Sequence, residues 1–235
     1  MPETVTYQAD GLTMRGDLYV GAGGGKRPGV LVFPEVFGLS ENARERARRL
    51  SELGFTALAC DLHGGARLVT DLDEAIGLLA PMRQNPERIS ARSRGGMDAL
   101  LAHNVDPAKI VAIGYCFGGT MALELARGGA ALAAVCGFHS GLATTRPEGA
   151  KNIRAKILVM IGADDPAIPP EQRAAFEAEM RAAQVDWQMH IYGGVLHSFT
   201  NKHADRVGRP ELARYDANAD SRSWASMLAL LAEFS

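Results

Sequence analysis

The sequence predicts an α/β fold built on a mostly parallel, doubly wound sheet. Short runs of consecutive apolar residues alternate along the chain with stretches of ten or more residues that have helical periodicity. A run that is apolar at every position is typical of a strand buried on both faces, as parallel strands are between two layers of helices. Repeated strand–helix–strand units therefore predict a parallel sheet with helices on both faces.

A β-hairpin is expected at the start of the chain. Residues 4–9 and 12–20 alternate in polarity and are joined around Asp10-Gly11, which is a strong hairpin signal. A Gly-rich turn over residues 21–25 separates this antiparallel hairpin from the first buried strand. The buried strands are expected over residues 29–33, 55–60, 109–115, 132–137, 156–161 and 187–192.

Amphipathic stretches between these strands predict the helices. The first opens at Ser40 and Glu41 and runs through Leu53, where Gly54 ends it. Others are expected within residues 71–80 and 87–103, and over residues 117–127, 169–183 and 218–234. We find no internal repeat, low-complexity tract or interdomain linker, so a single domain over residues 1–235 is expected.

The composition is that of an ordinary globular protein. Of the 235 residues, 47% are hydrophobic and 22% are charged, which provides enough apolar material for one sizeable core. The formal net charge of −2 creates no field that would attract nucleic acid or an anionic membrane, so neither partner is expected. Arg44, Arg46, Arg48 and Arg49 are interleaved with glutamates, and we interpret them as a solvated helix face.

Cysteine usage and hydropathy bear on the compartment. Cys60, Cys116 and Cys136 are odd in number and widely spaced, which argues against a disulfide framework and against a zinc site. Residues 1–10 are polar and lack the pattern of a signal peptide, and no run approaches the ~20 apolar residues that span a bilayer. A cytoplasmic location is expected.

Residues 110–119 combine a buried strand, a G-x-C-x-G-G turn and a helix. A nucleophile at Cys116 would sit on strained backbone, where Gly114 and Gly118 avoid the collisions that Cβ atoms would cause. The helix N-terminus favours a thiolate, and the N–H of Phe117 is placed to donate to an oxyanion. The alternative is a buried structural cysteine beside a tight crossover. The agreement of strand, glycines and helix favours the nucleophile.

An acid and a base are expected downstream, because an α/β-hydrolase presents nucleophile, acid and histidine in that order. Asp164 and Asp165 follow the strand at residues 156–161, and one carboxylate can hold the tautomer of a histidine. Two turn-forming aspartates are the alternative, and this is fully adequate for Asp164. His197 lies in the loop after the last strand and can fold back over the turn. His63 and His139 follow strand ends, where they can line the cleft.

These motifs resemble the dienelactone hydrolase family of α/β-hydrolases. The resemblance implies Cys116 as nucleophile, Asp165 as acid and His197 as base. The matching segments arrive in family order: Pro34-Glu35-Val36-Phe37-Gly38, Asp61-Leu62-His63, Gly114-Tyr115-Cys116-Phe117-Gly118-Gly119, Gly162-Ala163-Asp164-Asp165 and His197-Ser198-Phe199.

The resemblance also implies roles for Glu35 and Val36. In the family, the matching glutamate holds the thiol proton at rest and takes it when substrate enters, which keeps the sulfur less easily oxidised. The alternative is that Glu35 pairs with one of the many arginines, since an unpaired buried charge is costly. The N–H of Val36 would join that of Phe117 as the oxyanion hole.

Two positions depart from the family pattern. Members that act on dienelactone have an arginine four residues after the catalytic histidine, where this chain has Asn201. A second family arginine lies in the helix after the fourth strand, and this chain has Arg83 only nearby. The clamp for a substrate carboxylate is therefore expected to be incomplete. The candidate substrate-binding residues are Arg83, Asn201, His63 and His139.

The sequence thus predicts a hydrolase that cleaves a small carboxylic ester or lactone through a cysteine acyl-enzyme. No metal or organic cofactor is expected. A thioesterase or general carboxylesterase is the alternative within this class. A non-catalytic protein of the same fold, in which Cys116 serves as a sensor thiol, is the alternative from another class. We expect a monomer or a small homo-oligomer.

Overall fold

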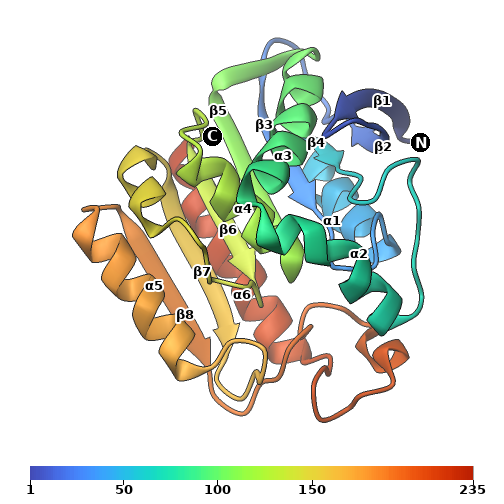
Figure 1. Cartoon of the computed structure of the whole chain (residues 1–235). Coiled ribbons are helices and arrows are strands. Elements are labelled where there is room, and N and C mark those ends of the chain that lie inside the picture. The colour runs from blue at the N-terminus through green and yellow to red at the C-terminus, as the bar shows by residue number, and fades with distance from the viewer. Residues whose placement is uncertain (235) are drawn as a thin grey trace.

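The computed structural model describes residues 1–234, in which eight strands form one sheet through the middle of the molecule (Figure 1). The order across the sheet is β1-β2-β4-β3-β5-β6-β7-β8. The bounds are β1 Glu3–Ala9, β2 Leu12–Tyr19, β3 Arg27–Phe33, β4 Thr56–Ala59, β5 Val105–Tyr115, β6 Ala134–Phe138, β7 Lys156–Gly162 and β8 Trp187–Tyr192.

The pairing of the strands confirms the predicted sheet. β1 pairs with β2, and β2 with β4, in antiparallel orientation. Every other neighbouring pair, from β3 with β4 to β7 with β8, is parallel. This is a mostly parallel sheet with an N-terminal antiparallel hairpin, as in the α/β-hydrolase fold. Parallel strands place their carboxyl ends along one edge, which is where ligands gather in open α/β sheets.

Helices cover both faces of the sheet (Figure 1). α3, α4 and α5 pack on one face, and α1 and α6 pack on the other. No helix within residues 1–234 combines the length and apolarity needed to cross a membrane. The α-helices are α1 Glu41–Glu52, α2 Leu72–Gln84, α3 Pro86–Leu101, α4 Phe117–Arg127, α5 Pro170–Ala182 and α6 Ala217–Leu231, with short 3₁₀ helices at Pro147–Asn152, Ala204–Val207 and Ala232–Phe234.

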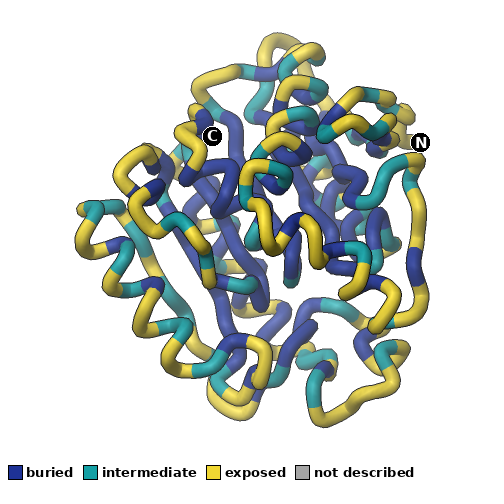
Figure 2. The backbone as a smooth tube through the Cα atoms, viewed as in Figure 1, coloured by how far each residue is buried: buried dark blue, intermediate teal, exposed yellow. Residues whose placement is uncertain are grey.

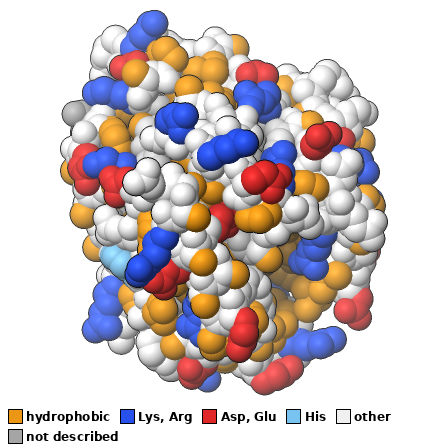
Figure 3. Space-filling view, turned by 60° about the vertical axis from the view of Figure 1, so that its left-hand side comes forward, with side chains coloured by type: hydrophobic (Ala, Val, Ile, Leu, Met, Phe, Trp, Pro, Cys, Tyr) orange, Lys and Arg blue, Asp and Glu red, His pale blue; other side chains and the backbone are white. Residues whose placement is uncertain are grey.

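The sheet separates two apolar layers, because successive side chains of a strand point to opposite faces. Val30 and Val32 of β3 belong to the layer with α1 and α6, whereas Leu31 and Phe33 belong to the layer with α3 and α4. All four side chains are fully buried. The central strands are therefore the dark, buried part of the tube in Figure 2. On the face drawn in Figure 3, basic and acidic side chains are interspersed.

Several element boundaries differ from the predicted ones. β3 and β5 begin earlier than residues 29 and 109, because their pairing continues past the apolar runs to Arg27↔Val105, with a shift in register after Pro28. β4 ends at Ala59, so Cys60 follows the strand rather than closing it. α2 continues through Pro81 to Gln84 instead of ending near residue 80.

The prediction of a solvated arginine face on α1 is wrong for Arg46. Its side chain is 3% exposed, and Nη2 lies 2.9 Å from Oδ1 of Asp220 on α6. The same nitrogen donates to the carbonyl oxygen of Thr200 at 2.6 Å. A buried guanidinium needs such partners, because burying it unpaired would cost several kcal/mol. Arg46 therefore ties α1 to the loop that follows β8.

Candidate active site

Candidate site residues lie within a few positions of the ends of neighbouring parallel strands. Glu35 follows β3, Cys116 follows β5, His139 follows β6 and Asp165 follows β7. His197 lies in the loop after β8. The fold thus brings these five residues to the same edge of the sheet.

Cys116 occupies a tight turn between β5 and α4. Its backbone has φ 55° and ψ −120°, a left-handed conformation that is strained for a residue with a Cβ atom. A Cβ atom on Gly114 would lie 2.0 Å from the carbonyl oxygen of Gly118, and one on Gly118 would lie 2.3 Å from that of Phe33. The two glycines are therefore required by the turn, which places the sulfur at the N-terminus of α4.

His197 is held by Asp165. Nδ1 of His197 lies 2.6 Å from Oδ2 of Asp165, and the other carboxylate oxygen accepts a hydrogen bond from the N–H of Ala167 at 2.8 Å. Asp165 is buried, so this contact is shielded from water. Asp164 is exposed, and its carboxylate makes no hydrogen bond within residues 1–234. The structure thus pairs the second aspartate, and not the first, with the imidazole.

The other side of the imidazole interacts with the sulfur of Cys116. Burial alone would lower the pKa of His197, but the Cys116 sulfur and the Asp165 carboxylate outweigh it and raise the pKa well above its usual value. The loop itself is fixed, because the N–H of His197 donates to the carbonyl of Leu212 and its carbonyl accepts from Arg214. The raised pKa favours the protonated form of the imidazole beside the sulfur.

Glu35 is 2% exposed, and no ion pair joins it to an arginine within residues 1–234. Oε2 accepts a hydrogen bond from Nδ2 of Asn201 at 2.7 Å, and Oε1 has no partner within residues 1–234. Burial raises the pKa of Glu35 despite the opposing effects of His197 and of nearby donors. No hydrogen bond joins Glu35 to Cys116 within residues 1–234. The carboxyl group instead faces Asn201 in this structure.

The two backbone N–H groups expected to form the oxyanion hole have no hydrogen-bond partner within residues 1–234. Phe117 is the first residue of α4, and the first N–H groups of a helix have no intrahelical acceptor. The N–H of Val36 makes no hydrogen bond within residues 1–234. The carbonyl of the same residue lies 2.8 Å from Nε2 of His63. His63 thus orients the Val36 peptide.

A cavity of about 480 Å³ opens beside Cys116 and His197. Arg83, at the end of α2, lies on its wall with its guanidinium 5.9 Å from the ring centre of Phe117. Thr120 and Glu124 line the cavity as well. They lie four and eight residues after Cys116, on the same face of α4. This helical spacing could have revealed both residues, which the sequence analysis did not single out.

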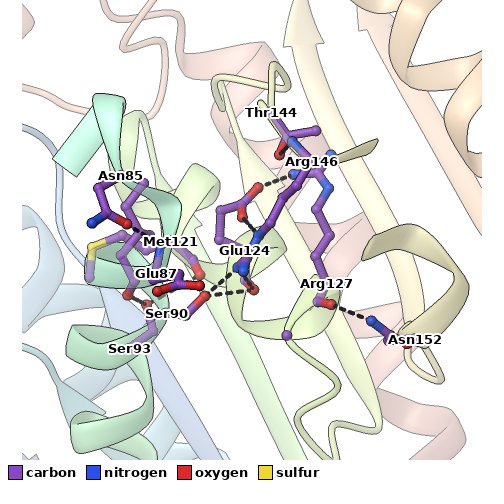
Figure 4. Close-up of polar contacts among 12 residues, drawn as sticks. Asn85, Glu87, Ser90, Ser93, Met121, Glu124, Arg127, Thr144, Arg146 and Asn152 are labelled. Atoms are coloured by element: carbon purple, nitrogen blue, oxygen red, sulfur yellow. Dashed lines mark hydrogen bonds and ion pairs between the residues drawn. The ribbon is translucent and has the colours of Figure 1, made fainter. Parts of the chain in front are cut away.

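Glu124 connects the cavity wall to a network of charged side chains behind it (Figure 4). The two carboxylate oxygens of Glu124 accept from Arg127 and Arg146, each at 2.8 Å. Arg127 also pairs with Glu179 on α5, at 2.7 and 2.8 Å. Two acidic and two basic groups balance one another, so this network has no net formal charge.

Comparison with known proteins places the chain in a family. The model of the dienelactone hydrolase family matches residues 14–235.

The chain belongs to the dienelactone hydrolase family.

Solved structures of other members are similar to this dienelactone hydrolase family member throughout. A protein named m3DLH is 43% identical, with a TM-score of 0.94 over 99% of this chain and 98% of its own. A dienelactone hydrolase-like promiscuous phosphotriesterase from metagenomic libraries is 40% identical, with the same TM-score and coverage. A protein of Aquifex aeolicus with the provisional name carboxymethylenebutenolidase is 25% identical over 91% of this chain and 93% of its own length. The enzyme is a carboxylic ester or lactone hydrolase.

Three of the four candidate substrate-binding residues do not line the cavity of this family member. The amide of Asn201 is directed to Glu35, because that buried carboxyl group needs a donor. Nε2 of His63 is hydrogen-bonded to the carbonyl oxygen of Val36. His139 is fully buried behind His197, with Nε2 2.8 Å from the hydroxyl of Thr200. Only Arg83 lies on the cavity wall, as expected from the sequence.

Proposed function

We propose that this enzyme cleaves neutral esters or lactones through an acyl-enzyme on Cys116, with His197 as base and Asp165 as its partner. The observation that carries the proposal is the position of His197. One ring nitrogen is engaged by Asp165 at 2.6 Å, and the imidazole also interacts with the sulfur, which lies at a helix N-terminus. This leaves the second ring nitrogen to exchange a proton at the reacting bond.

In the first half-reaction, the thiolate of Cys116 attacks the carbonyl carbon of the substrate. The carbonyl oxygen becomes an oxyanion, which the N–H groups of Val36 and Phe117, without partners within residues 1–234, would stabilise. The C–O bond then breaks as His197 transfers its proton to the leaving alkoxide. The products of this step are an alcohol, or the opened ring of a lactone, and a thioester on the enzyme.

In the second half-reaction, neutral His197 takes a proton from water. The resulting hydroxide attacks the thioester, and the same N–H groups face the second oxyanion. Collapse of this intermediate releases the carboxylic acid and restores the sulfur beside the imidazolium. Asp165 keeps the imidazole in one tautomer and stabilises its charged form in both steps.

Glu35 is proposed to exchange a proton with the reacting thiol. Its raised pKa and buried position suit a group that alternates between acid and carboxylate. Its contact with Asn201 in this state implies that Glu35 moves toward the sulfur when it acts. A carboxyl group that is held by neutral donors can make this move more easily than one held by an arginine.

The lack of a complete carboxylate clamp supports the choice of neutral substrates. Arg83 is exposed, and charge contacts of exposed groups are weakened by water and salt. Asn201, at the other clamp position, carries no charge and is occupied by Glu35. Small neutral esters and lactones therefore fit the cavity better than anionic ones.

Hydrolysis of phosphotriesters is a second candidate function. It is favoured by the 40% identity, across nearly all of both chains, to a promiscuous phosphotriesterase. The same thiolate would attack phosphorus in place of carbon and expel an alcohol, and water would release the phosphoryl group from sulfur. The test is turnover of a p-nitrophenyl phosphotriester by the wild type and by Cys116→Ala. If both reactions use Cys116, this variant should lose turnover of the phosphotriester together with that of p-nitrophenyl acetate.

The proposed function is tested by turnover of p-nitrophenyl acetate. Cys116→Ala should abolish turnover, and Cys136→Ala, which changes a buried cysteine of β6, serves as the matched control. A folded wild-type protein that turns over no ester in a broad panel would favour the sensor-thiol alternative. A preference for thioesters in that panel would instead favour a thioesterase.

A further inference from the structure

His139 lies against the imidazole of His197, on the side away from the cavity. The two ring centres are 5.0 Å apart and the planes cross at 66°, an edge-to-face contact. His139 follows β6 directly, and its N–H donates to the carbonyl of Met160 at 2.8 Å. Nε2 lies 2.8 Å from Oγ1 of Thr200. Both His139 and Thr200 are completely buried, so neither can contact substrate.

We propose that His139, held by Thr200, is a positioning residue that fixes the ring orientation of His197. This inference rests on the proposed role of His197 as the base.

The need for a positioning residue follows from how few contacts hold the base. Asp165 engages one nitrogen of His197, and the sulfur of Cys116 interacts with the ring from the other side. These contacts leave the ring free to tilt about the line that joins them. An aromatic neighbour packed edge-to-face removes this freedom. Such control matters, because a misplacement of about 1 Å can cost about 10²-fold in rate.

His139 is itself held from several directions. Its ring centre is 5.2 Å from that of Phe199, with the planes at 81°. Its backbone has φ 41°, in the left-handed region, which aims the side chain under the loop after β8. The carbonyl of Thr200 accepts from the buried Arg46 at 2.6 Å. A continuous set of contacts thus runs from α1 through Thr200 and His139 to the base.

A neutral His139 is what this position requires. Burial lowers the pKa of His139 well below its usual value, and the nearby charges of His197 and Arg46 act in the same direction. The other charged groups near the base, Asp165 and Glu35, stabilise the imidazolium of His197 instead. His139 therefore does not compete with His197 for the proton.

The hydrogen bonds also select one tautomer of His139. Nδ1 has no partner within residues 1–234. A buried N–H without a partner is rarer and costlier than a lone pair without one, so the proton belongs on Nε2, which then donates to Thr200. Replacing Thr200 by Val should thus release the orientation of the His139 ring while keeping its volume.

The test compares His139→Ala, His139→Phe and Thr200→Val with the wild type. We measure kcat and KM for p-nitrophenyl acetate, and the rate of Cys116 alkylation by iodoacetamide at pH 6 and pH 9. His139→Ala should lower kcat about 10- to 100-fold, with KM changed by less than about threefold. In this variant, the ratio of the Cys116 alkylation rate at pH 6 to that at pH 9 should fall about tenfold, because the imidazolium is no longer held in place beside the sulfur. His139→Phe restores an aromatic ring and should recover most of the kcat and of the alkylation ratio. Thr200→Val should lose less of both than His139→Ala does.

Tyr192→Ala is the matched control. The ring of Tyr192 packs on that of Phe199 with the ring centres 5.6 Å apart, and it makes no ring contact with His197 within residues 1–234. Its loss should therefore reduce thermal stability and leave the alkylation ratio unchanged. The proposal is overturned if the folded variants at positions 139 and 200 keep the wild-type kcat and alkylation ratio, or if Tyr192→Ala changes the ratio equally. Failure of the proposed function would show differently, as esterase activity that survives Cys116→Ala.

Discussion

Asp165 and His197 are separated by 32 positions in the sequence, yet Oδ2 of the aspartate lies 2.6 Å from Nδ1 of the histidine. The loop after β7 and the loop after β8 make this contact possible, because the two strands are parallel neighbours. The adjacent Asp164 points to solvent. A pair of carboxylates that is equivalent in the sequence is therefore divided into one partner for the imidazole and one surface residue.

The first prediction concerns this pair. Asp165→Asn preserves the shape of the side chain but removes the charge that stabilises the imidazolium and can favour the wrong tautomer. We expect kcat to fall by up to about 10⁴-fold, as in serine-protease triads. Asp164→Asn is the matched control and should leave kcat within about twofold. A larger loss for Asp164→Asn, measured under the same conditions, would contradict the assignment.

The second prediction concerns the three thiols. Because the pKa of His197 is raised, the imidazolium persists at neutral pH and keeps the sulfur of Cys116 reactive down to pH 6. Burial raises the pKa of Cys136 to about 12 and that of Cys60 even further. Iodoacetamide at pH 7 should therefore label Cys116 stoichiometrically and the other two slowly, which peptide mass spectrometry can measure. Faster labelling at Cys60 or Cys136 in the folded protein would count against this account.

The third prediction concerns the pH dependence of stability at Glu35. Burial raises its folded pKa above the unfolded value, so its stabilising effect is complete below the unfolded pKa, near 4.5. This effect is lost as pH rises through the folded pKa. Glu35→Gln cannot ionise, so its free energy of unfolding should improve relative to the wild type between pH 5 and pH 8.

The same variant separates a proton-exchange role from a structural one. We expect Glu35→Gln to lower turnover and to change the pH dependence of Cys116 alkylation, with a nearly unchanged melting temperature at acidic pH. Asn201→Ala, which removes the amide that donates to Oε2 of Glu35, is the companion variant. A Glu35→Gln protein that only loses stability, with normal kcat, would point to a packing role.

The fourth prediction concerns substrate charge. A hydrogen bond to a charged group is worth about 1.5–3 kcal/mol, or roughly 10- to 100-fold in kcat/KM. Arg83 is exposed, so its effect should be smaller than this. A carboxylated lactone and its methyl ester should be hydrolysed with kcat/KM values within about tenfold, and Arg83→Ala should change the ratio little. A strong preference for the free acid that disappears in Arg83→Ala would show that this residue alone forms the clamp.

Much of the fold was predictable because buried strands and helix ends have local signals. The apolar run Val30–Phe33 and the glycines around Cys116 follow from packing and steric rules that act within a few residues. The boundaries at Arg27 and Val105 could not be predicted in this way, because these residues pair across the sheet beyond the apolar runs.

The site was predictable to the extent that its residues follow strands. The order of the family motifs along the sequence predicted that Cys116, Asp165 and His197 belong to one site. The surroundings depend on contacts between distant segments, such as Asn201 with Glu35 and Arg46 with Thr200, 166 and 154 positions apart. No periodicity reports contacts of this kind, so the sequence alone does not show that Asn201 contacts Glu35 or that His139 packs against His197.

The central claim is that hydrolysis passes through a thioester on Cys116. The most direct measurement is acid quenching of the enzyme within milliseconds of mixing with excess p-nitrophenyl butyrate, followed by intact-mass and peptide mass spectrometry. The account predicts a mass increase of one acyl group, located on Cys116, that forms and decays at rates consistent with turnover and is absent from Cys116→Ala. Steady turnover by Cys116→Ala, or an acyl group on any other residue that turns over at the same rate, would contradict it.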